Sequence, residues 1–233
     1  MIISHRKNFL FLHTPKTGGT AIIDRLLPYA RWQDRLAYQR EHAFLVRALF
    51  PKLYKGPAGI TRLTGLKLHA GLKDGEGVFG REKLSILFKF GMVRNPYTRT
   101  YSLYRFIARN PRHPLHTKVN AESFEEFVTY ICKHRWAQQH DRFCWRGDTG
   151  LSVDHVAIFE NYNEECAFLA KRLNIPALEN PRTINVGDHE AVDYNDLFHN
   201  VRDIFLKWYA PDFEAFHYSK DPARATEAPK LPD

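Results

Sequence analysis

The sequence predicts a single α/β domain built on a central, mainly parallel sheet flanked by helices. Three observations lead to this fold class. Apolar runs of strand length alternate with longer stretches of helical apolar spacing. Two of the junctions between a strand and a helix are tight turns with Gly or Pro, as in α/β units. The chain of 233 residues suits one hydrophobic core rather than two full domains.

The first half of the chain supplies two strand-turn-helix units. Residues 8–14 are an apolar run of strand length, and residues 20–27 have helical apolar spacing. Residues 85–93 form the second expected strand, and the helix expected over 96–108 begins with a proline, which the first turn tolerates. Each unit therefore places a turn directly before a helix.

Other elements are expected around these two units. A helix followed by a loop is expected within 38–59, and a short strand over 65–69. Ser123 and Glu126 have the spacing of a capping box, which predicts a helix over about 123–138.

The second half continues the alternation of strands and helices. A strand is expected over 153–160, and amphipathic helices over 160–174 and 192–209. We therefore assign residues 1–219 to one domain. Residues 220–233 are rich in Pro, Ala, Lys and Asp and are expected to form a flexible C-terminal tail.

Bulk properties restrict the class of protein. The net charge of +8 favours anionic partners: nucleotides, acidic sugars, nucleic acid or an anionic membrane surface. Charges soon interrupt the N-terminal apolar run, so neither a signal peptide nor a transmembrane segment is expected. Three cysteines give no disulfide framework and suit reducing conditions, which predicts a cytoplasmic protein.

The segment HTPKTGGT, residues 13–20, has the form of a phosphate-binding loop. It joins a strand to a helix through two glycines, so main-chain N–H groups and the positive end of the helix meet at one place. Lys16 precedes the glycines, whereas the Walker A loop of ATP- and GTP-binding proteins has lysine directly after the last glycine. The alternative reading is a glycine-rich turn that merely joins a strand to a helix.

This loop resembles the 5′-phosphosulfate loop of sulfotransferases that use 3′-phosphoadenosine 5′-phosphosulfate (PAPS), in particular the carbohydrate-type, family 2-like branch. The matching letters are PKTGGT. The resemblance implies a P-loop-like nucleotide-binding sulfotransferase fold, with a lysine at the oxygen that bridges phosphorus and sulfur. It also implies four residues that hold the 5′-phosphate. The lysine is Lys16, and the four residues are Thr17, Gly18, Gly19 and Thr20.

A second segment, VRNPYTRTYSLYRF, resembles the 3′-phosphate segment of the same family. Arg94 follows the expected strand, and Ser102 lies eight residues later on the following helix. Arginine suits a phosphate because its planar fork donates parallel hydrogen bonds and stays charged. Arg99 adds to the positive field. The alternative is a surface arginine and a small packing residue.

The resemblance continues through FEEFV, VDHVAIFEN and the aromatic and acidic residues near the C-terminus, and so spans nearly the whole chain. The stretch 180–189 resembles the late loop that closes over the nucleotide, which implies a contact from Arg182 to the 3′-phosphate or the adenine. The Arg- and Gly-rich form of that loop is not matched here.

Sulfuryl transfer also needs a group that takes the proton of the acceptor. We choose His69, at the end of an expected strand between the two motifs, because imidazole titrates near neutral pH. The family resemblance favours a histidine here, although this sequence has His-Ala-Gly where the family has Gly-His. His13 is a rival, and three glutamates rank below both: Glu41, Glu76 and Glu82.

Two further clusters are assigned structural roles. Cys132, His134, His140 and Cys144 do not fit a usual zinc spacing, so no metal is expected. Aromatic residues that alternate with arginines are assigned to the core rather than to a sugar-binding cleft. They are Trp136, Phe143 and Trp145.

The predicted function is transfer of the sulfuryl group of PAPS to a hydroxyl of a sugar, a glycolipid or another acceptor, with a histidine base. No nucleic-acid partner is expected, and the basic surface leaves peripheral membrane contact open. Two alternatives remain: an ATP-dependent phosphoryl transferase of kinase type, and a non-enzymatic basic binding module.

Overall fold

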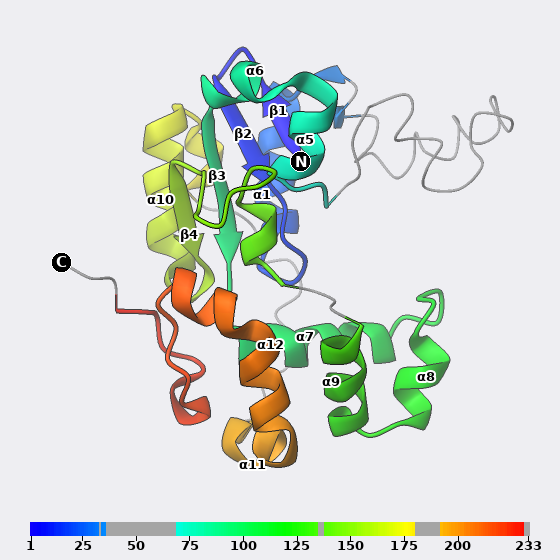
Figure 1. Cartoon of the computed structure of the whole chain (residues 1–233). Helices are drawn as coiled ribbons and strands as arrows, with labels where there is room; N and C mark the ends of the chain where they lie inside the picture. Colours follow the sequence, from blue (N-terminus) through cyan, green and yellow to red (C-terminus); the bar gives the residue numbers. More distant parts are fainter. Residues whose placement is uncertain (33, 36–68, 135–137, 180–191, 231–233) are drawn as a thin grey trace, which may run out of the picture.

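The computed structural model describes residues 1–32, 34–35, 69–134, 138–179 and 192–230 (Figure 1). Its centre is a four-stranded sheet with the strand order β1-β2-β3-β4. β1 pairs antiparallel with β2, and β2, β3 and β4 run parallel to one another. The strands are β1 Ile2–Ser4, β2 Phe9–Leu12, β3 Phe88–Val93 and β4 His155–Ile158. The prediction of an α/β fold with a mainly parallel sheet is confirmed.

The register brings the carboxyl ends of the three parallel strands to one edge of the sheet. Leu12 pairs with Gly91, and Val93 pairs with Ile158. The chain therefore leaves β2, β3 and β4 on the same side, which is where open α/β sheets bind their ligands.

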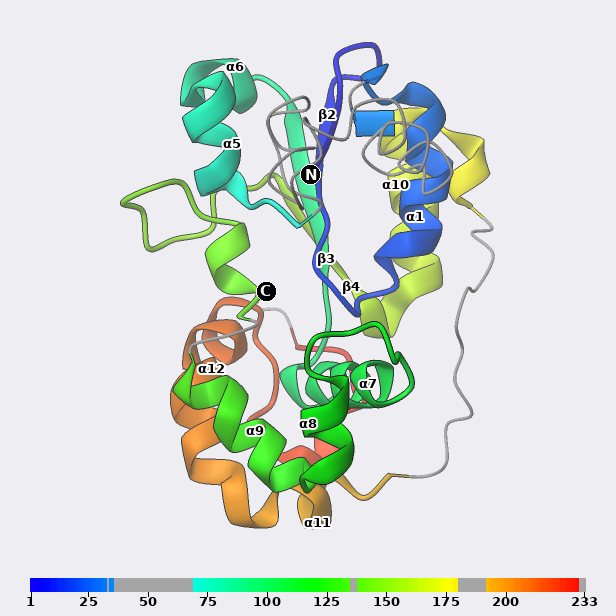
Figure 2. The same ribbon diagram turned by 90° about the vertical axis from the view of Figure 1, so that its right-hand side faces the viewer.

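Alternating residues of the strands pack on opposite faces. Phe9 and Phe11 join Phe90 in the cluster beneath α1 and α10, whereas Leu10 and Leu12 face α5 and α6. Figure 2 shows the sheet edge-on between these two layers. The helices are α1 Gly19–Leu26, α5 Leu72–Phe79, α6 Arg81–Ser85 and α10 Tyr162–Leu173.

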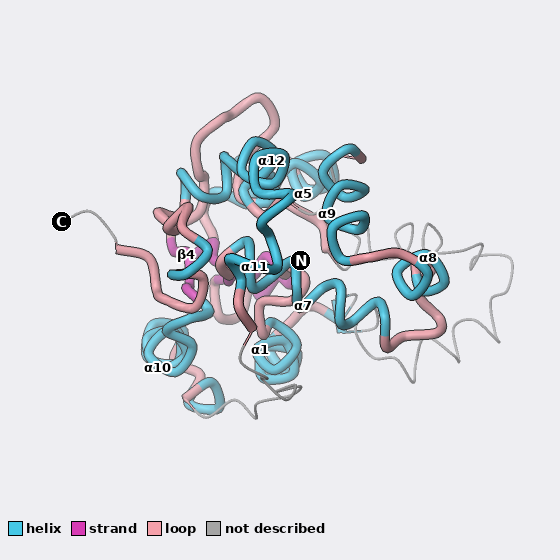
Figure 3. The backbone as a smooth tube through the Cα atoms, turned by 90° about the horizontal axis from the view of Figure 1, so that it is seen from below, coloured by secondary structure: helices cyan, strands magenta, loops and turns pink. Residues whose placement is uncertain are grey.

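A third group of helices covers the carboxyl end of the sheet (Figures 1 and 3). Its interior is aromatic: Tyr97 packs on Phe198, Phe205 and Phe213, with ring centroids 4.8, 5.0 and 5.2 Å away. These helices are α7 Pro96–Ala108, α8 His116–Ala121, α9 Phe124–Lys133, α11 Tyr194–Phe198 and α12 Arg202–Ala215. Short 3-10 turns are Leu27–Tyr29, His140–Arg142, Phe159–Asn161, Pro176–Leu178, His199–Val201 and Pro222–Arg224.

The predicted capping box is confirmed. The Ser123 hydroxyl accepts from the Glu126 N–H at 3.2 Å, and the Glu126 carboxylate accepts from the Ser123 N–H at 2.7 Å. The helix that follows ends at Lys133, before the predicted end at 138. The helix predicted over 192–209 is divided into α11 and α12, because the chain turns through His199–Val201 between them.

Part of the segment predicted as a flexible tail contacts the helical layer. Tyr97 donates its hydroxyl to the Lys220 carbonyl at 2.9 Å, and Pro222 and Ala225 are buried. These small apolar residues suffice to pack the segment against the aromatic interior of the helical layer.

Several predictions fall outside the described residues. They are the helix within 38–59, most of the strand over 65–69, Glu41, Trp136 and Arg182. None of the helices in the described ranges has both the length and the apolar character that a membrane span requires.

Candidate active site

The loop between β2 and α1 has two left-handed residues. Lys16 has φ of 69° and Gly18 has φ of 73°. The Thr17 hydroxyl donates to the Thr14 carbonyl at 2.9 Å, and Arg99 donates its Nε–H to the Pro15 carbonyl at 3.0 Å. The loop is therefore bent back. One hydrogen bond within the loop and one from Arg99 on α7 hold it before α1 begins at Gly19.

Both glycines of the loop are closely surrounded. A Cβ atom on Gly18 would lie 2.8 Å from a ring carbon of Tyr162 and 3.0 Å from one of Phe159. A Cβ atom on Gly19 would lie 2.5 Å from Cδ2 of His13. The Tyr162 hydroxyl also donates to the Gly18 carbonyl at 3.3 Å. Aromatic rings thus line the loop where side chains are absent.

Arg94 lies directly after β3 and reaches the loop. Its Nε–H donates to the Thr98 hydroxyl at 2.9 Å, and one terminal nitrogen donates to the Lys16 carbonyl at 3.5 Å. The guanidinium carbon lies 4.4 Å from the centre of the Phe159 ring. The structure therefore brings together the two motifs that the sequence predicted to form one site.

The pKa values of both cations at this place are lowered. Burial lowers the pKa of Lys16, and the charge of Arg94 lowers it further. Burial likewise lowers the pKa of Arg94, although the charge of Glu160 opposes this change. Among the described residues, no carboxylate forms an ion pair with either cation. Such an accumulation of positive charge favours a bound anion.

The Glu160 carboxylate accepts hydrogen bonds from groups other than Lys16 and Arg94. It accepts from the Asn95 N–H at 2.9 Å and from the Tyr218 hydroxyl at 2.8 Å. Burial raises the pKa of the Glu160 carboxyl, and these hydrogen bonds oppose the rise. Asn95 in turn caps α7, since its side chain accepts from the Tyr97 N–H at 3.0 Å.

The remaining predicted residues occupy different positions around the loop. Ser102 is half-buried on α7, and Thr20 is exposed in the first turn of α1. The Lys16 ammonium lies 4.6 Å from the centre of the Phe106 ring, which is 44% exposed. Arg99 is almost fully buried, so it braces the loop through Pro15 instead of adding to an open positive surface.

His69 lies against His13, with ring centroids 4.6 Å apart. His69 Nδ1 is 3.3 Å from the His13 carbonyl oxygen, which can only accept a hydrogen bond. Nδ1 must therefore carry the proton, which leaves the lone pair on Nε2. Burial and the charge of Arg142 lower the pKa of His69 to about 4, so the imidazole is neutral at pH 7.

Burial, followed by the charge of His69, also lowers the pKa of His13 well below its usual value. Arg142 donates to the His69 carbonyl, which anchors this segment to the chain before β4. The two histidines that the sequence proposed as rival bases are thus neighbours in one neutral pair.

The sequence analysis gave no individual role to three residues that support Arg94: Gln139, Glu160 and Tyr218. Gln139 bonds to the main chain of Arg94 across 45 positions of sequence. Neither residue spacing nor a local pattern relates groups so far apart. The only available sequence signal is a polar residue within a buried segment, and the sequence does not show which polar residues will be buried.

The cysteine and histidine cluster brings Cys144 close to His140. Cys144 Sγ lies 3.6 Å from His140 Nε2, but burial raises the pKa of the thiol. Across the described ranges, no group of three His, Cys, Asp or Glu residues is placed to hold a metal. Phe143 and Trp145 are buried, so their predicted core packing is confirmed.

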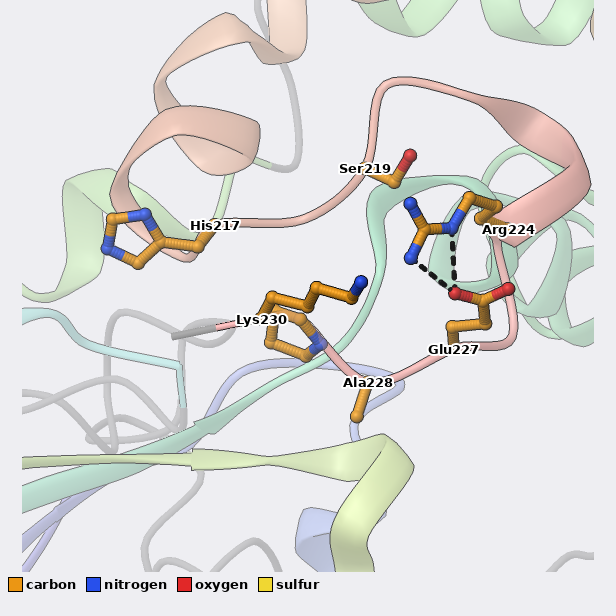
Figure 4. Close-up of a pocket in the computed structure, with 7 residues that line it drawn as sticks. His217, Ser219, Arg224, Glu227, Ala228 and Lys230 are labelled. Atoms are coloured by element: carbon orange, nitrogen blue, oxygen red, sulfur yellow. Dashed lines mark hydrogen bonds and ion pairs between the residues drawn. The ribbon is translucent and has the colours of Figure 1, made fainter. Parts of the chain in front are cut away.

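A surface pocket near the C-terminus lies apart from the predicted site residues (Figure 4). Arg224 and Glu227 on its wall form an ion pair of 2.7 Å, so the charge of Arg224 is already compensated. The pocket is lined by His217, Ser219, Arg224, Glu227, Ala228, Pro229 and Lys230.

The glycine loop lies before a helix, at the carboxyl edge of a parallel sheet and beside two partly buried cations. This arrangement is typical of anion-binding α/β proteins. A family model described as the sulfotransferase family matches residues 1–219. The chain therefore belongs to the sulfotransferase family, of the family 2 type, and is a transferase of sulfuryl groups. No curated protein and no solved structure gives a significant match.

Proposed function

We propose that the protein transfers the sulfuryl group of PAPS to a hydroxyl of a carbohydrate or glycolipid acceptor. One observation carries the proposal: Lys16 and Arg94 lie at the ends of adjacent parallel strands, in contact, partly buried and without a carboxylate ion pair among the described residues. PAPS is a polyanion with phosphate groups on both sides of its ribose, and a site that holds two cations suits it. The family generally uses this donor.

The donor is assigned to the two motifs. The loop residues Thr17, Gly18, Gly19 and Thr20 bind the 5′-phosphate with main-chain N–H groups and hydroxyls at the start of α1. Arg94 and Ser102 bind the 3′-phosphate. This assignment is supported by the bent loop and by the contact between Arg94 and Lys16.

The reaction is an in-line displacement at sulfur. The acceptor oxygen forms a bond to sulfur while the bond between sulfur and the bridging oxygen breaks, and the electron pair stays on the departing phosphate. The acceptor proton passes to His69 Nε2, and Lys16 offsets the charge that develops on the leaving oxygen. The neutral state of His69 and its assigned tautomer support this role.

The carbohydrate acceptor rests on the resemblance of PKTGGT to the carbohydrate-type branch. Phe106 supports it, since a partly exposed ring beside Lys16 offers an apolar face to a sugar. The cytoplasmic location is part of the same proposal and is supported by three unpaired thiols, Cys132, Cys144 and Cys166.

Arg94→Met tests the donor assignment. In wild type we expect adenosine 3′,5′-bisphosphate to bind more tightly than AMP or ATP, measured by calorimetry. Losing a charge-assisted bond to phosphate costs about 1.5–3 kcal/mol, so Arg94→Met should weaken binding of the bisphosphate by roughly 10- to 150-fold.

Arg109→Met is the matched control, because it removes the same charge from an exposed position at the C-terminal end of α7. It should leave the affinity unchanged. Labelled sulfuryl transfer from PAPS to oligosaccharides then identifies the acceptor. Equal or tighter binding of ATP would overturn the proposal in favour of a phosphoryl transferase.

A further inference from the structure

The main chain of Arg94 is held by one buried side chain. Gln139 Nε2 donates to the Arg94 carbonyl at 2.8 Å, and Gln139 Oε1 accepts from the Arg94 N–H at 3.0 Å. The last pair of the ladder between β3 and β4 is Val93 with Ile158. Arg94 therefore lies just beyond the sheet, and the Gln139 amide supplies the two hydrogen bonds that a further strand residue would have supplied.

Gln139 is itself fixed by a buried carboxylate on α12. The Asp212 oxygens accept from the Gln139 N–H at 2.9 Å and from the His140 N–H at 2.8 Å. Gln139 Nε2 also lies 3.4 Å from Asp212 Oδ2. Because a carboxylate only accepts, it orients the amide with its nitrogen toward Asp212 and its oxygen toward the Arg94 N–H. Both residues are fully buried.

The same carboxylate is linked to the phosphate loop. The positive charge of Arg99 acts on Asp212, and Arg99 donates to the Pro15 carbonyl directly before Lys16. Asp212 is thus joined to Arg94 by hydrogen bonds through Gln139, whereas its relation to the loop is the electrostatic effect of Arg99. Within the described part of the chain, the Asp212 carboxylate accepts from Gln139 and His140 and not from Arg94 itself.

We propose that Gln139 and Asp212 are positioning residues that direct the Arg94 guanidinium toward the 3′-phosphate of the donor. This inference rests on the proposed function. Fixing both main-chain groups of Arg94 fixes the direction in which its side chain leaves the backbone. An arginine binds phosphate through two parallel N–H bonds only when its plane is correctly aimed. The effect should therefore be confined to ligands that carry a 3′-phosphate.

An effect limited to ligands with a 3′-phosphate distinguishes a positioning role from a merely structural role. If Gln139 only stabilises the fold, its loss lowers stability and weakens all nucleotides alike. If it aims Arg94, its loss weakens adenosine 3′,5′-bisphosphate and leaves AMP, which lacks the 3′-phosphate, nearly unchanged. The quantity to measure is the ratio of the two dissociation constants.

The experiment compares Gln139→Met with Gln138→Met by calorimetry against both nucleotides. The two residues are adjacent, but the Gln138 amide donates to the Trp208 carbonyl on α12 and not to Arg94. For Gln139→Met we expect the preference for the bisphosphate over AMP to fall about tenfold. A loss of this size is typical when buried hydrogen bonds that orient a charged group are removed. Gln138→Met should keep the wild-type preference.

Asp212→Asn is the second variant, because it keeps the shape of the side chain while removing its charge. It should lower the same preference, and it replaces Gln139→Met if that variant does not fold. An unchanged preference in a folded variant, or an equal loss for both nucleotides, overturns the positioning role alone. A wild type that does not prefer the bisphosphate overturns the proposed function, and the positioning role with it.

Discussion

Replacing Gly18 by alanine should destabilise the protein by two separable effects. A left-handed backbone costs a residue with a Cβ atom about 1–2 kcal/mol, and Gly18 has φ of 73°. The new methyl would also lie 2.8 Å from Tyr162 and 3.0 Å from Phe159. Overpacking of this kind costs about 1–3 kcal/mol. Together they predict a loss of about 2–5 kcal/mol in the free energy of unfolding.

Gly147 provides the control for the backbone effect alone. It has φ of 86°, and a Cβ atom there would meet no atom within 4 Å. Gly147→Ala should therefore cost only about 1–2 kcal/mol in urea denaturation. Adding Tyr162→Leu to Gly18→Ala should recover part of the loss, which a double-mutant cycle measures as coupling. Equal losses for Gly18→Ala and Gly147→Ala, with no coupling to Tyr162, would refute the steric argument.

Two further predictions concern titratable groups. The pKa of His69 is about 4 in the folded chain, below the value of about 6.5 for an unfolded histidine. The unfolded state therefore binds more protons between these values, and stability is lost as the pH falls through this range. Urea denaturation at several pH values should show this slope, and His69→Gln should reduce it; an unchanged slope would contradict the assignment. Tyr218→Phe removes the hydroxyl that donates to Glu160. It should lower the free energy of unfolding by about 1–3 kcal/mol and raise the pKa of the buried carboxyl further, whereas an unaltered Tm would show that the hydrogen bond contributes nothing.

Local signals in the sequence predicted local structure. The strand-loop-helix units predicted from residues 8–27 and 85–108 correspond to β2 with α1 and to β3 with α7. These predictions succeed because strand runs, glycine turns and proline at a first helical turn each act within a few residues. Lys16 lies in the loop after β2, and Arg94 comes directly after β3, so the parallel pairing of these strands brings both residues to one edge of the sheet.

The sequence could not predict interactions that tertiary packing creates. β1 is only three residues long, and its pairing with β2 depends on a turn that carries no Asn-Gly or Asp-Gly signal. The helix expected over 192–209 was divided, because the aromatic residues of both halves pack inward around Tyr97. Apolar spacing alone does not show where a helix must turn to reach such a cluster.

The proposed positioning of Arg94 by Asp212 has a consequence for synthesis of the protein. Translation delivers the strands and the phosphate loop first, because chains emerge from the amino end. Arg94 is made early, yet its main-chain partner Gln139 is fixed only after Asp212 has left the ribosome. A nascent chain that stops before α12 therefore contains the residues of the sheet and the loop but lacks the carboxylate that fixes Gln139. If Asp212 positions Arg94 as proposed, the site binds the 3′-phosphate only late in translation. Binding of adenosine 3′,5′-bisphosphate to released chains of increasing length would locate that moment.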